Sequence, residues 1–265
     1  MLRVIIDGPR DPHYNMAIDE AIMGLRPYVK YDTLRIYMWS PSGVSIGRSQ
    51  DAQRAVNIEE IKRLGFKLVR RPTGGGALLH PENNEITYSV VLSLDNPLAK
   101  IPVDESASSI ARGIIDALQT IGSSAKVKDF GDKEKHDLCY LRRGSSDVIL
   151  GGKKISGSAQ VRNDRALLQH GTLLLRFEPE VWLRVINAPG YDHEMLRNRI
   201  AGLYEFTDVK LEKIIDSLVK GFSKELGDET FIGSLTPEEV QLSLELYQKK
   251  YSNDLWNLKG SLEQF

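Results

Sequence analysis

The sequence predicts an α+β fold in which helices pack on a sheet. Strand-like and helical patterns follow one another in an irregular order, with hairpin-like neighbouring strands in the middle of the chain and helices at its end. This order disfavours a regular array of β-α-β units. The chain has 265 residues, of which 41% are hydrophobic and 27% charged, so its composition is that of a globular protein with a buried core.

Short apolar or alternating segments predict the strands. They are Leu2–Ile6, Thr33–Met38, Lys67–Arg71, Glu85–Leu94, Asp147–Leu150 and Ala166–Leu175. Longer segments with apolar residues at helical spacing predict helices. They are Tyr14–Leu25, Ser106–Ile121 and Leu211–Phe222.

Two further helices are predicted by the residues at their ends. Asn57 can cap one helix, and Gly65 can end it in the left-handed conformation. Near the C-terminus, Thr236 can cap another helix, Pro237 suits its first position and Glu239 completes a capping box.

Charge and hydropathy exclude two broad classes of partner. The formal net charge is -1, from 35 basic and 36 acidic side chains, and no long run of either sign is present, so no nucleic-acid partner is expected. No apolar run approaches the roughly 20 residues of a membrane span. The single cysteine, Cys139, agrees with a reducing compartment. We expect a cytoplasmic protein without a membrane partner and, because no repeat or linker is visible, a single domain over residues 1–265.

The most informative segment is RRPTGGGALLH, from Arg70 to His80, directly after a predicted strand. Three successive glycines let backbone N–H groups approach a ligand where a Cβ would collide. Two guanidinium groups beside them supply charged donors for phosphate or carboxylate. The segment therefore predicts an anion-binding loop, with a tight hairpin turn carrying exposed arginines as the alternative. The spacing of a Walker loop is missing, and no helix follows as in a dinucleotide fingerprint.

Two further segments place small or polar residues beside predicted strands. In GGKKISGSAQ, Gly151–Gln160, small side chains leave room for a ligand against the backbone, and a lysine can neutralise a phosphate or carbonyl oxygen. A β-hairpin with solvated lysines is the alternative. In Gln169–Thr172, QHGT interrupts a run of leucines, which is typical of a site that overrides packing. A buried core histidine is the alternative there, and the five histidines show no metal-ligand spacing.

Taken in order, RRPTGGGALLH, NNEITYS at Asn83–Ser89, GGKKISGSAQ and LQHGTLLL closely resemble the lipoate–protein ligase A and octanoyltransferase family. The resemblance begins near Asn15–Glu20 and extends to Tyr251–Asn257. It implies a fold similar to the catalytic domain of biotin–protein ligases, with a mixed, largely antiparallel sheet flanked by helices. It also implies a pocket that holds an acyl-adenylate.

The resemblance assigns roles to residues of these motifs. Lys154 should contact both the α-phosphate and the acyl carbonyl and act electrostatically, while Arg70 and the glycine backbone should hold the nucleotide phosphates. Asp147 is the candidate ligand for a Mg2+ ion that enters with ATP. The candidate binding residues are Arg70, Arg71, Gly74, Gly75, Gly76, Ala77, Leu78, His80, Asp147, Lys154, Gly157, Ser158, Ala159, His170, Gly171 and Thr172.

Two mechanisms share this family scaffold. The main interpretation is an ATP-dependent lipoate–protein ligase, which activates lipoate or octanoate as acyl-AMP and transfers it to a lysine. It rests on the complete triple glycine and on Gly144–Asp147, which is similar to the Gly-Arg-Asn-Asp segment of ligases although Ser145 and Ser146 differ. The alternative is an ATP-independent octanoyltransferase, in which Cys139, fifteen positions before Lys154, forms an acyl-thioester.

The resemblance also implies partners. The expected acceptors are lipoyl-carrier domains of 2-oxoacid dehydrogenase complexes or the glycine-cleavage H protein, and acyl-carrier protein is the donor if the chain is a transferase. Because the resemblance ends at Tyr251–Asn257, we expect the C-terminal accessory domain of longer ligases to be absent and, for a ligase, a small separate accessory subunit. No bound prosthetic group is expected. A non-catalytic lipoate-binding protein is a second alternative, and biotin attachment is a nearer rival within the same fold.

Overall fold

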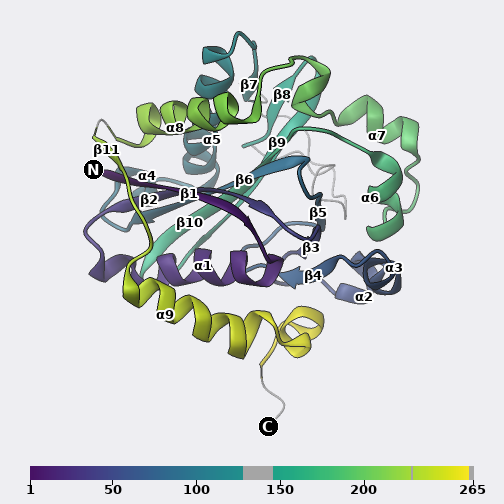
Figure 1. Cartoon of the computed structure of the whole chain (residues 1–265), viewed down its shortest axis with the longest axis horizontal. Coiled ribbons are helices and arrows are strands. Elements are labelled where there is room, and N and C mark those ends of the chain that lie inside the picture. The colour runs from purple at the N-terminus through teal and green to yellow at the C-terminus, as the bar shows by residue number, and fades with distance from the viewer. Residues whose placement is uncertain (128–145, 228, 263–265) are drawn as a thin grey trace.

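The computed structural model describes residues 1–127, 146–227 and 229–262. An 8-stranded sheet forms the centre, in the order β11-β1-β2-β6-β10-β9-β8-β7 (Figure 1). The pairs β11–β1 and β1–β2 are parallel and the other pairs are antiparallel. The prediction of a mixed, largely antiparallel sheet is therefore confirmed. The strands are β1 Leu2–Arg10, β2 Asp32–Trp39, β6 Glu85–Ser93, β7 Lys126–Val127, β8 Val148–Leu150, β9 Lys153–Arg162, β10 Ala166–Leu174 and β11 Thr230–Ile232.

A second, 3-stranded sheet has the order β4-β3-β5. Its central strand β3, Gly43–Ile46, pairs in parallel with β4, Lys67–Arg70, and antiparallel with β5, Leu78–His80. The RRPTGGGALLH segment begins at the end of β4 and ends with β5. The small sheet therefore fixes both ends of the predicted anion-binding loop.

Helices cover both faces of the large sheet, with α5 and α8 on one face and α1 and α9 on the other (Figure 1). Ile110 and Ile114 of α5 and Phe222 of α8 belong to the same buried cluster as Ile36 and Tyr88 of the sheet. The described helical segments are α1 Pro12–Leu25, η1 Arg26–Tyr28, α2 Ala52–Ala55, α3 Ile58–Arg63, α4 Pro97–Lys100, α5 Val103–Thr120, α6 Pro179–Val185, α7 His193–Arg199, η2 Leu203–Glu205, α8 Leu211–Leu226, α9 Pro237–Leu246, η3 Tyr247–Tyr251 and η4 Leu255–Lys259.

The predicted helix ends are confirmed. The Asn57 side chain accepts a hydrogen bond from the backbone N–H of Glu60 at 3.1 Å, and Gly65 has a φ of +72°. Thr236 and Glu239 form the predicted capping box of α9. These features were predictable because a cap depends on a few neighbouring residues.

For Gly151–Gln160, the alternative of a β-hairpin describes the backbone, but Lys154 is buried and not solvated. Gly151 and Gly152 form a turn with φ values of +56° and +81°, but from Lys153 onward the segment is the long strand β9. Its small residues lie in the middle of the sheet, where β9 pairs with β10. The short strands β3, β5, β7 and β11 were not predicted, whereas β4 and β8, which are as short, were.

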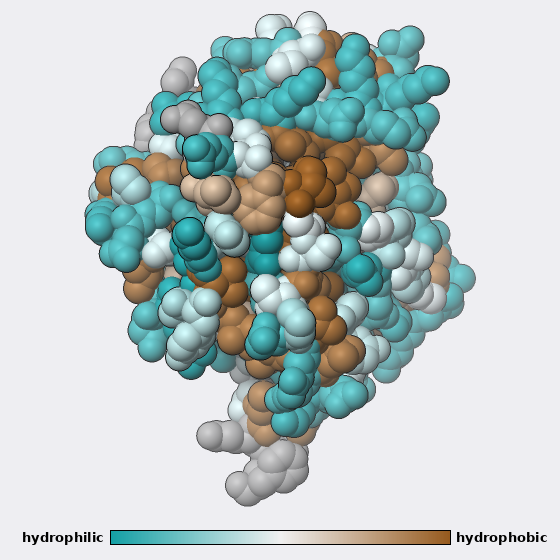
Figure 2. All heavy atoms as spheres, turned by 60° about the vertical axis from the view of Figure 1, so that its left-hand side comes forward, coloured by the Kyte–Doolittle hydropathy of each residue, from teal (hydrophilic) through white to brown (hydrophobic). Residues whose placement is uncertain are grey.

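Strand β11 lies at one edge of the large sheet and covers only the first part of β1, because it pairs with Leu2 to Val4. On this side of the molecule hydrophobic residues gather in patches between hydrophilic ones (Figure 2). Within β1 and β11, the exposed large hydrophobic side chains are Ile6 and Ile232. Among the residues that the structure describes, no helix combines the length and the hydrophobicity needed to cross a membrane.

Arg70 ties the C-terminal segment to the small sheet, which corrects its expected role at a nucleotide phosphate. Its side chain is buried, with 1% of the residue exposed, and all five guanidinium N–H groups point at backbone carbonyls 2.6 to 3.1 Å away. No N–H group remains for a ligand. The carbonyls belong to Gly47, Arg48, Gln50, Trp256, Asn257 and Leu258.

We predict that Arg70→Lys destabilises the protein, because an ammonium offers three N–H donors and cannot reach carbonyls on two sides of a planar fork. Leaving several buried carbonyls without donors should lower the free energy of unfolding by about 3 kcal/mol, as measured by chemical denaturation. The matched control is Arg63→Lys, which changes an exposed side chain that pairs with Glu60. Equal stability of the two variants would contradict the structural role assigned to Arg70.

Candidate active site

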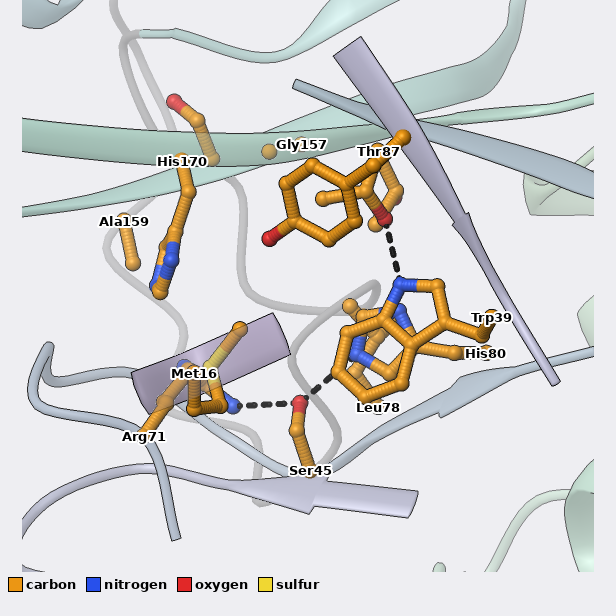
Figure 3. Close-up of a pocket in the computed structure, with 14 residues that line it drawn as sticks. Met16, Trp39, Ser45, Arg71, Leu78, His80, Thr87, Gly157, Ala159 and His170 are labelled. Carbon is orange, nitrogen blue, oxygen red and sulfur yellow. Dashed lines mark hydrogen bonds between the residues drawn. The ribbon is translucent and has the colours of Figure 1, made fainter. Parts of the chain in front are cut away.

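A pocket lies between the two sheets and the N-terminal half of α1 (Figure 3). It encloses about 410 Å³ of space between atoms, open solvent at its mouth included. Met16, Trp39 and Leu78 give it apolar walls. The complete lining is Met16, Tyr37, Trp39, Ser45, Arg71, Leu78, His80, Thr87, Gly157, Ser158, Ala159, His170, Gly171 and Thr172.

Residues from all the motifs meet in this pocket. The predicted residues that line it are Arg71, Leu78, His80, Gly157, Ser158, Ala159, His170, Gly171 and Thr172. Met16 and Thr87 were not predicted, although they lie within the NMAIDE and NNEITYS segments. Tyr37, Trp39 and Ser45 were also missed, because they stand on strands without a motif and only the strand register shows that they face inward.

Arg71 holds the triple-glycine loop in place. Its Nη2 donates to the carbonyl oxygens of Gly74 and Gly76, each at 2.8 Å, and its Nη1 donates to Ser45 Oγ at 3.1 Å. Gly75 has a φ of +99° and packs closely on Gly47, where an added Cβ would lie 2.1 Å from the Gly75 carbonyl oxygen. The loop is therefore a fixed turn around a guanidinium, and Ala77 behind it is fully buried.

Lys154 and Asp147 form a buried ion pair beside the pocket. Lys154 Nζ lies 2.8 Å from Asp147 Oδ1, and both side chains are almost fully buried. An added Cβ on Gly157 would lie 2.8 Å from Lys154 Cε and 3.0 Å from Nζ, so the ammonium rests against a glycine of the pocket wall. Asp147 therefore already balances a cation. Among the described residues, no cluster of three or more His, Cys, Asp or Glu side chains could hold a metal ion.

The glycines of β9 and β10 allow the two strands to line the pocket with their backbones. Gly171 stands opposite Ser158, and Gly157 stands opposite Thr172. A Cβ on Gly171 would lie 2.6 Å from the carbonyl oxygen of Gly157 and 2.7 Å from the hydroxyl of Tyr88. Any larger residue at position 171 would therefore push β9 away, which explains the glycine within a leucine-rich strand.

His170 links the large sheet to the glycine loop. Its Nδ1 lies 3.3 Å from Asp19 Oδ2, and its Nε2 lies 2.7 Å from Thr73 Oγ1. Asp19 also accepts hydrogen bonds from Arg35, Tyr37 and Ser89. Burial lowers the pKa of His170 below its usual value, so the neutral ring donates from Nδ1 and accepts at Nε2.

Asp19 remains ionised in this buried network. Burial acts to raise its pKa, but the hydrogen bond from His170 and the charge of Arg35 outweigh burial, and the pKa lies below its ordinary value. The Arg35 guanidinium donates to Asp19 Oδ1 at 2.9 Å, and neither side chain is exposed. The carboxylate is thus fully engaged in holding α1 against the sheet.

Cys139, the candidate nucleophile of the transferase interpretation, lies outside the described residues. Ser146 marks the start of the following described segment, and its hydroxyl accepts a hydrogen bond from Ser158 of the pocket lining at 2.9 Å. The chain that follows residues 128–145 therefore enters the structure at the pocket.

The lowered pKa of His170 predicts a loss of stability in acid. Below about pH 6.5 the unfolded chain binds a proton that the native, buried ring resists, so stability falls as pH falls, by at most about 1.4 kcal/mol per pH unit. We expect His170→Gln to have a smaller difference in unfolding free energy between about pH 7.5 and about pH 5 than the unchanged protein. Burial also lowers the pKa of His13, so the double variant with His13→Gln should flatten the profile further. An unchanged pH dependence of the unfolding free energy in both variants would show that the loss of stability in acid does not come from these histidines.

Three comparisons place the chain among known proteins. A family model described as "Lipoyl protein ligase A/B catalytic domain" matches residues 11–223. A protein named octanoyltransferase LipM from Brevibacillus brevis is 34% identical, covering 97% of this chain and 98% of that protein. A crystal structure of lipoate-protein ligase A bound with ATP is 27% identical with a TM-score of 0.85, covering 98% of this chain and 99% of that chain. A bipartite lipoate protein ligase from Thermoplasma acidophilum, described with its E2 lipoyl domain, is 27% identical with a TM-score of 0.81, covering 99% of this chain and 98% of that chain.

The sequence relatives correct the main functional interpretation. Further relatives, 29% to 34% identical over nearly their whole length, carry the same name of octanoyltransferase, among them a protein from Bacillus subtilis. The expectation of an ATP-dependent lipoate–protein ligase is therefore wrong, and these relatives support the transferase alternative. The ligase structures share the fold, since the same scaffold can carry different chemistry.

Proposed function

We propose, because the chain belongs to the lipoyl protein ligase A/B catalytic domain family, that it is an octanoyltransferase that works without ATP. The chain is an enzyme of the lipoate ligase and octanoyltransferase family. In our proposal it takes an octanoyl group from acyl-carrier protein and transfers it to a lysine of a lipoyl-carrier domain. The observation that carries the proposal is the near full-length similarity to proteins named octanoyltransferase, at 34% identity.

The proposed reaction has two acyl transfers. In the first, the Cys139 thiolate attacks the thioester carbonyl of octanoyl–acyl-carrier protein, a new C–S bond forms, the old one breaks, and the carrier thiol leaves with a proton. In the second, the neutral amine of the acceptor lysine attacks the Cys139 thioester, an amide C–N bond forms, the C–S bond breaks, and the cysteine sulfur takes up the proton that the amine loses. The thioester already activates the acyl group, so the reaction needs neither ATP nor Mg2+.

Lys154 suits the role of stabilising the negative charge that develops on the carbonyl oxygen. Its ammonium lies against Gly157 of the pocket wall and is fixed by Asp147 at 2.8 Å. A preorganised cation in a site that excludes water loses little energy to reorganisation during the reaction. Loss of one such donor typically costs about 3–4 kcal/mol of transition-state stabilisation.

The pocket suits a medium-length acyl chain. Met16, Trp39, Leu78 and Ala159 offer apolar contacts, and each buried methylene contributes about 0.8 kcal/mol. An octanoyl chain would therefore be held mainly by its methylene groups. Octanoate has no charge along its chain, in agreement with these walls.

Lipoyl-carrier domains are the proposed acceptors. The Thermoplasma acidophilum ligase of the same fold is described together with its E2 lipoyl domain, which supports this class of partner. The accessory subunit expected for a ligase has no role here, because the proposed reaction contains no adenylation step.

The decisive experiment follows the mass of a lipoyl-carrier domain. We expect the domain to gain one octanoyl group when the full chain is incubated with octanoyl–acyl-carrier protein, at the same rate with and without Mg-ATP. Cys139→Ser should abolish this transfer, because a serine hydroxyl is a far weaker nucleophile than a thiolate at neutral pH. Transfer that requires free octanoate and Mg-ATP would refute the proposal.

Gly157→Ala tests the role assigned to Lys154 without removing the lysine. The added Cβ would collide with the flexible end of the Lys154 side chain at 2.8 Å, so the ammonium should move while the fold remains. We expect transfer to slow by about tenfold or more with little change in melting temperature. Gly8→Ala is the control, since a Cβ there meets nothing within 4 Å. Equal rates in the two variants would exclude the proposed position of the ammonium.

A further inference from the structure

Ser45, His80 and Glu85 form a hydrogen-bonded chain at the pocket. Ser45 Oγ lies 2.8 Å from His80 Nε2, and His80 Nδ1 lies 2.8 Å from Glu85 Oε1. Ser45 and His80 both line the pocket, where the serine hydroxyl stands between the Arg71 guanidinium and the histidine ring (Figure 3). A hydroxyl, an imidazole and a carboxylate in this order are the groups of a serine nucleophile and its base.

In this series of hydrogen bonds, groups that can only donate determine which atom is the donor in each bond. Trp39 Nε1 donates to Thr87 Oγ1 at 2.8 Å, so the Thr87 hydroxyl gives its own proton to Glu85 Oε1 at 2.5 Å. Glu85 Oε1 then accepts from His80 Nδ1–H, which leaves Nε2 to accept. At the other end Arg71 donates to Ser45 Oγ, so the serine proton points at His80 Nε2.

The charge balance supports a catalytic arrangement. Glu85 is buried with 0% of its side chain exposed, and within the described part of the chain His80 is the basic side chain that contacts it, with Nδ1 2.8 Å from Oε1. Its Oε2 makes no hydrogen bond there. A buried carboxylate that no other cation neutralises stabilises an imidazolium beside it. His80 also stacks on Trp39, with ring centroids 3.8 Å apart, and an indole face favours a cation.

The same molecule contains a similar chain that lacks these properties. Thr73, His170 and Asp19 are also connected by hydrogen bonds, but Asp19 is already neutralised by Arg35 and accepts from Tyr37 and Ser89. Thr73 does not line the pocket, whereas Ser45 does. The contrast shows that pocket access and uncommitted carboxylate charge distinguish the Ser45 chain from a structural network.

We propose that Ser45, His80 and Glu85 form a second nucleophilic centre, which takes the acyl group of a medium-chain acyl thioester or ester onto Ser45 and passes it to water. Arg71 Nη1, 3.1 Å from Ser45 Oγ, places a positive charge beside the nucleophile, where it favours the negative charge that develops on the acyl oxygen. Trp39, Met16 and Leu78 line the same pocket and form the acyl-binding walls. The substrate class is thus set by the apolar lining and the activity is hydrolysis.

The chemical steps balance without a further reagent. Ser45 Oγ attacks the acyl carbonyl and its proton passes to His80 Nε2. The C–S or C–O bond of the substrate breaks, and the leaving thiolate or alkoxide takes the proton from His80. Water then attacks the Ser45 ester with His80 as base, the ester C–O bond breaks, and the free carboxylic acid and the serine hydroxyl are released.

The test uses the full chain with Cys139→Ala, so that the proposed cysteine cannot react. We expect an octyl fluorophosphonate to form a P–O bond with Ser45, with loss of fluoride, as located by mass spectrometry of peptides. The same protein should release octanoate from p-nitrophenyl octanoate. Absence of label at Ser45 under conditions that label an ordinary serine esterase would overturn the proposal.

Three variants in this background separate catalysis from folding. Ser45→Ala should abolish labelling. Glu85→Gln keeps the size of the side chain but removes the charge that orients His80, and it should slow labelling by about tenfold or more. Ser89→Ala removes a buried hydroxyl outside the pocket and should label like the background protein. Labelling of Glu85→Gln at the unchanged rate, with melting temperatures equal, would also overturn the proposal.

This inference shares the acyl pocket with the proposed function but can fail independently of it. Octanoyl transfer by the unchanged chain without hydrolysis by the Cys139→Ala variant would leave the transferase intact and refute the Ser45 centre. Hydrolysis and Ser45 labelling without any ATP-independent transfer would support the Ser45 centre and refute the transferase.

Discussion

The pocket depends on one guanidinium, that of Arg71. Its N–H groups hold the carbonyls of Gly74 and Gly76, the hydroxyl of Ser45 and, at 3.2 Å, the hydroxyl of Thr73. Thr73 in turn bonds His170 of the large sheet. A planar fork with five donors can satisfy acceptors in several directions at once, whereas an ammonium on a flexible stem cannot. The glycine loop, the small sheet and the large sheet are thereby held around the same cavity.

Burial gives the polar groups around this cavity their different roles. Asp19 and Asp147 are each neutralised by a cation less than 3 Å away, Arg35 and Lys154 respectively, and these pairs fix α1 and β9 beside the pocket. Glu85 has only a histidine as its ion-pair partner in the described part of the chain. The cost of a buried charge therefore depends on its partner, and the partner decides whether the carboxylate is a structural support or remains available to a reaction.

The sequence predicted the α+β class and most of the long elements because their signals are local, but it missed strand β9, whose small and polar residues show no alternating apolar pattern. Helical spacing and caps such as Asn57 act within a few residues, and the ordered motifs place their residues on adjoining strands. The pocket residues Tyr37, Trp39 and Ser45 were not predictable, because the direction of a strand side chain follows from pairing with distant strands. The two adjacent arginines illustrate this limit. Successive strand residues face opposite sides, so Arg70 turns to the C-terminal segment and Arg71 turns to the pocket.

The same limit explains why the ligase interpretation failed. It rests on Gly144–Asp147 and on the complete triple glycine, which predicts a loop for nucleotide phosphates. In the structure the carbonyls of Gly74 and Gly76 are bound by Arg71, and Gly75 leaves no room for a Cβ on Gly47. Contacts within this chain thus account for the shape of the loop, whichever acyl donor is used. A ligase and a transferase both need an apolar slot and a cation near the acyl carbonyl, and they differ in the group that leaves the carbonyl. Motifs that build the slot cannot distinguish the two reactions, and the sequence relatives named octanoyltransferase support the transferase.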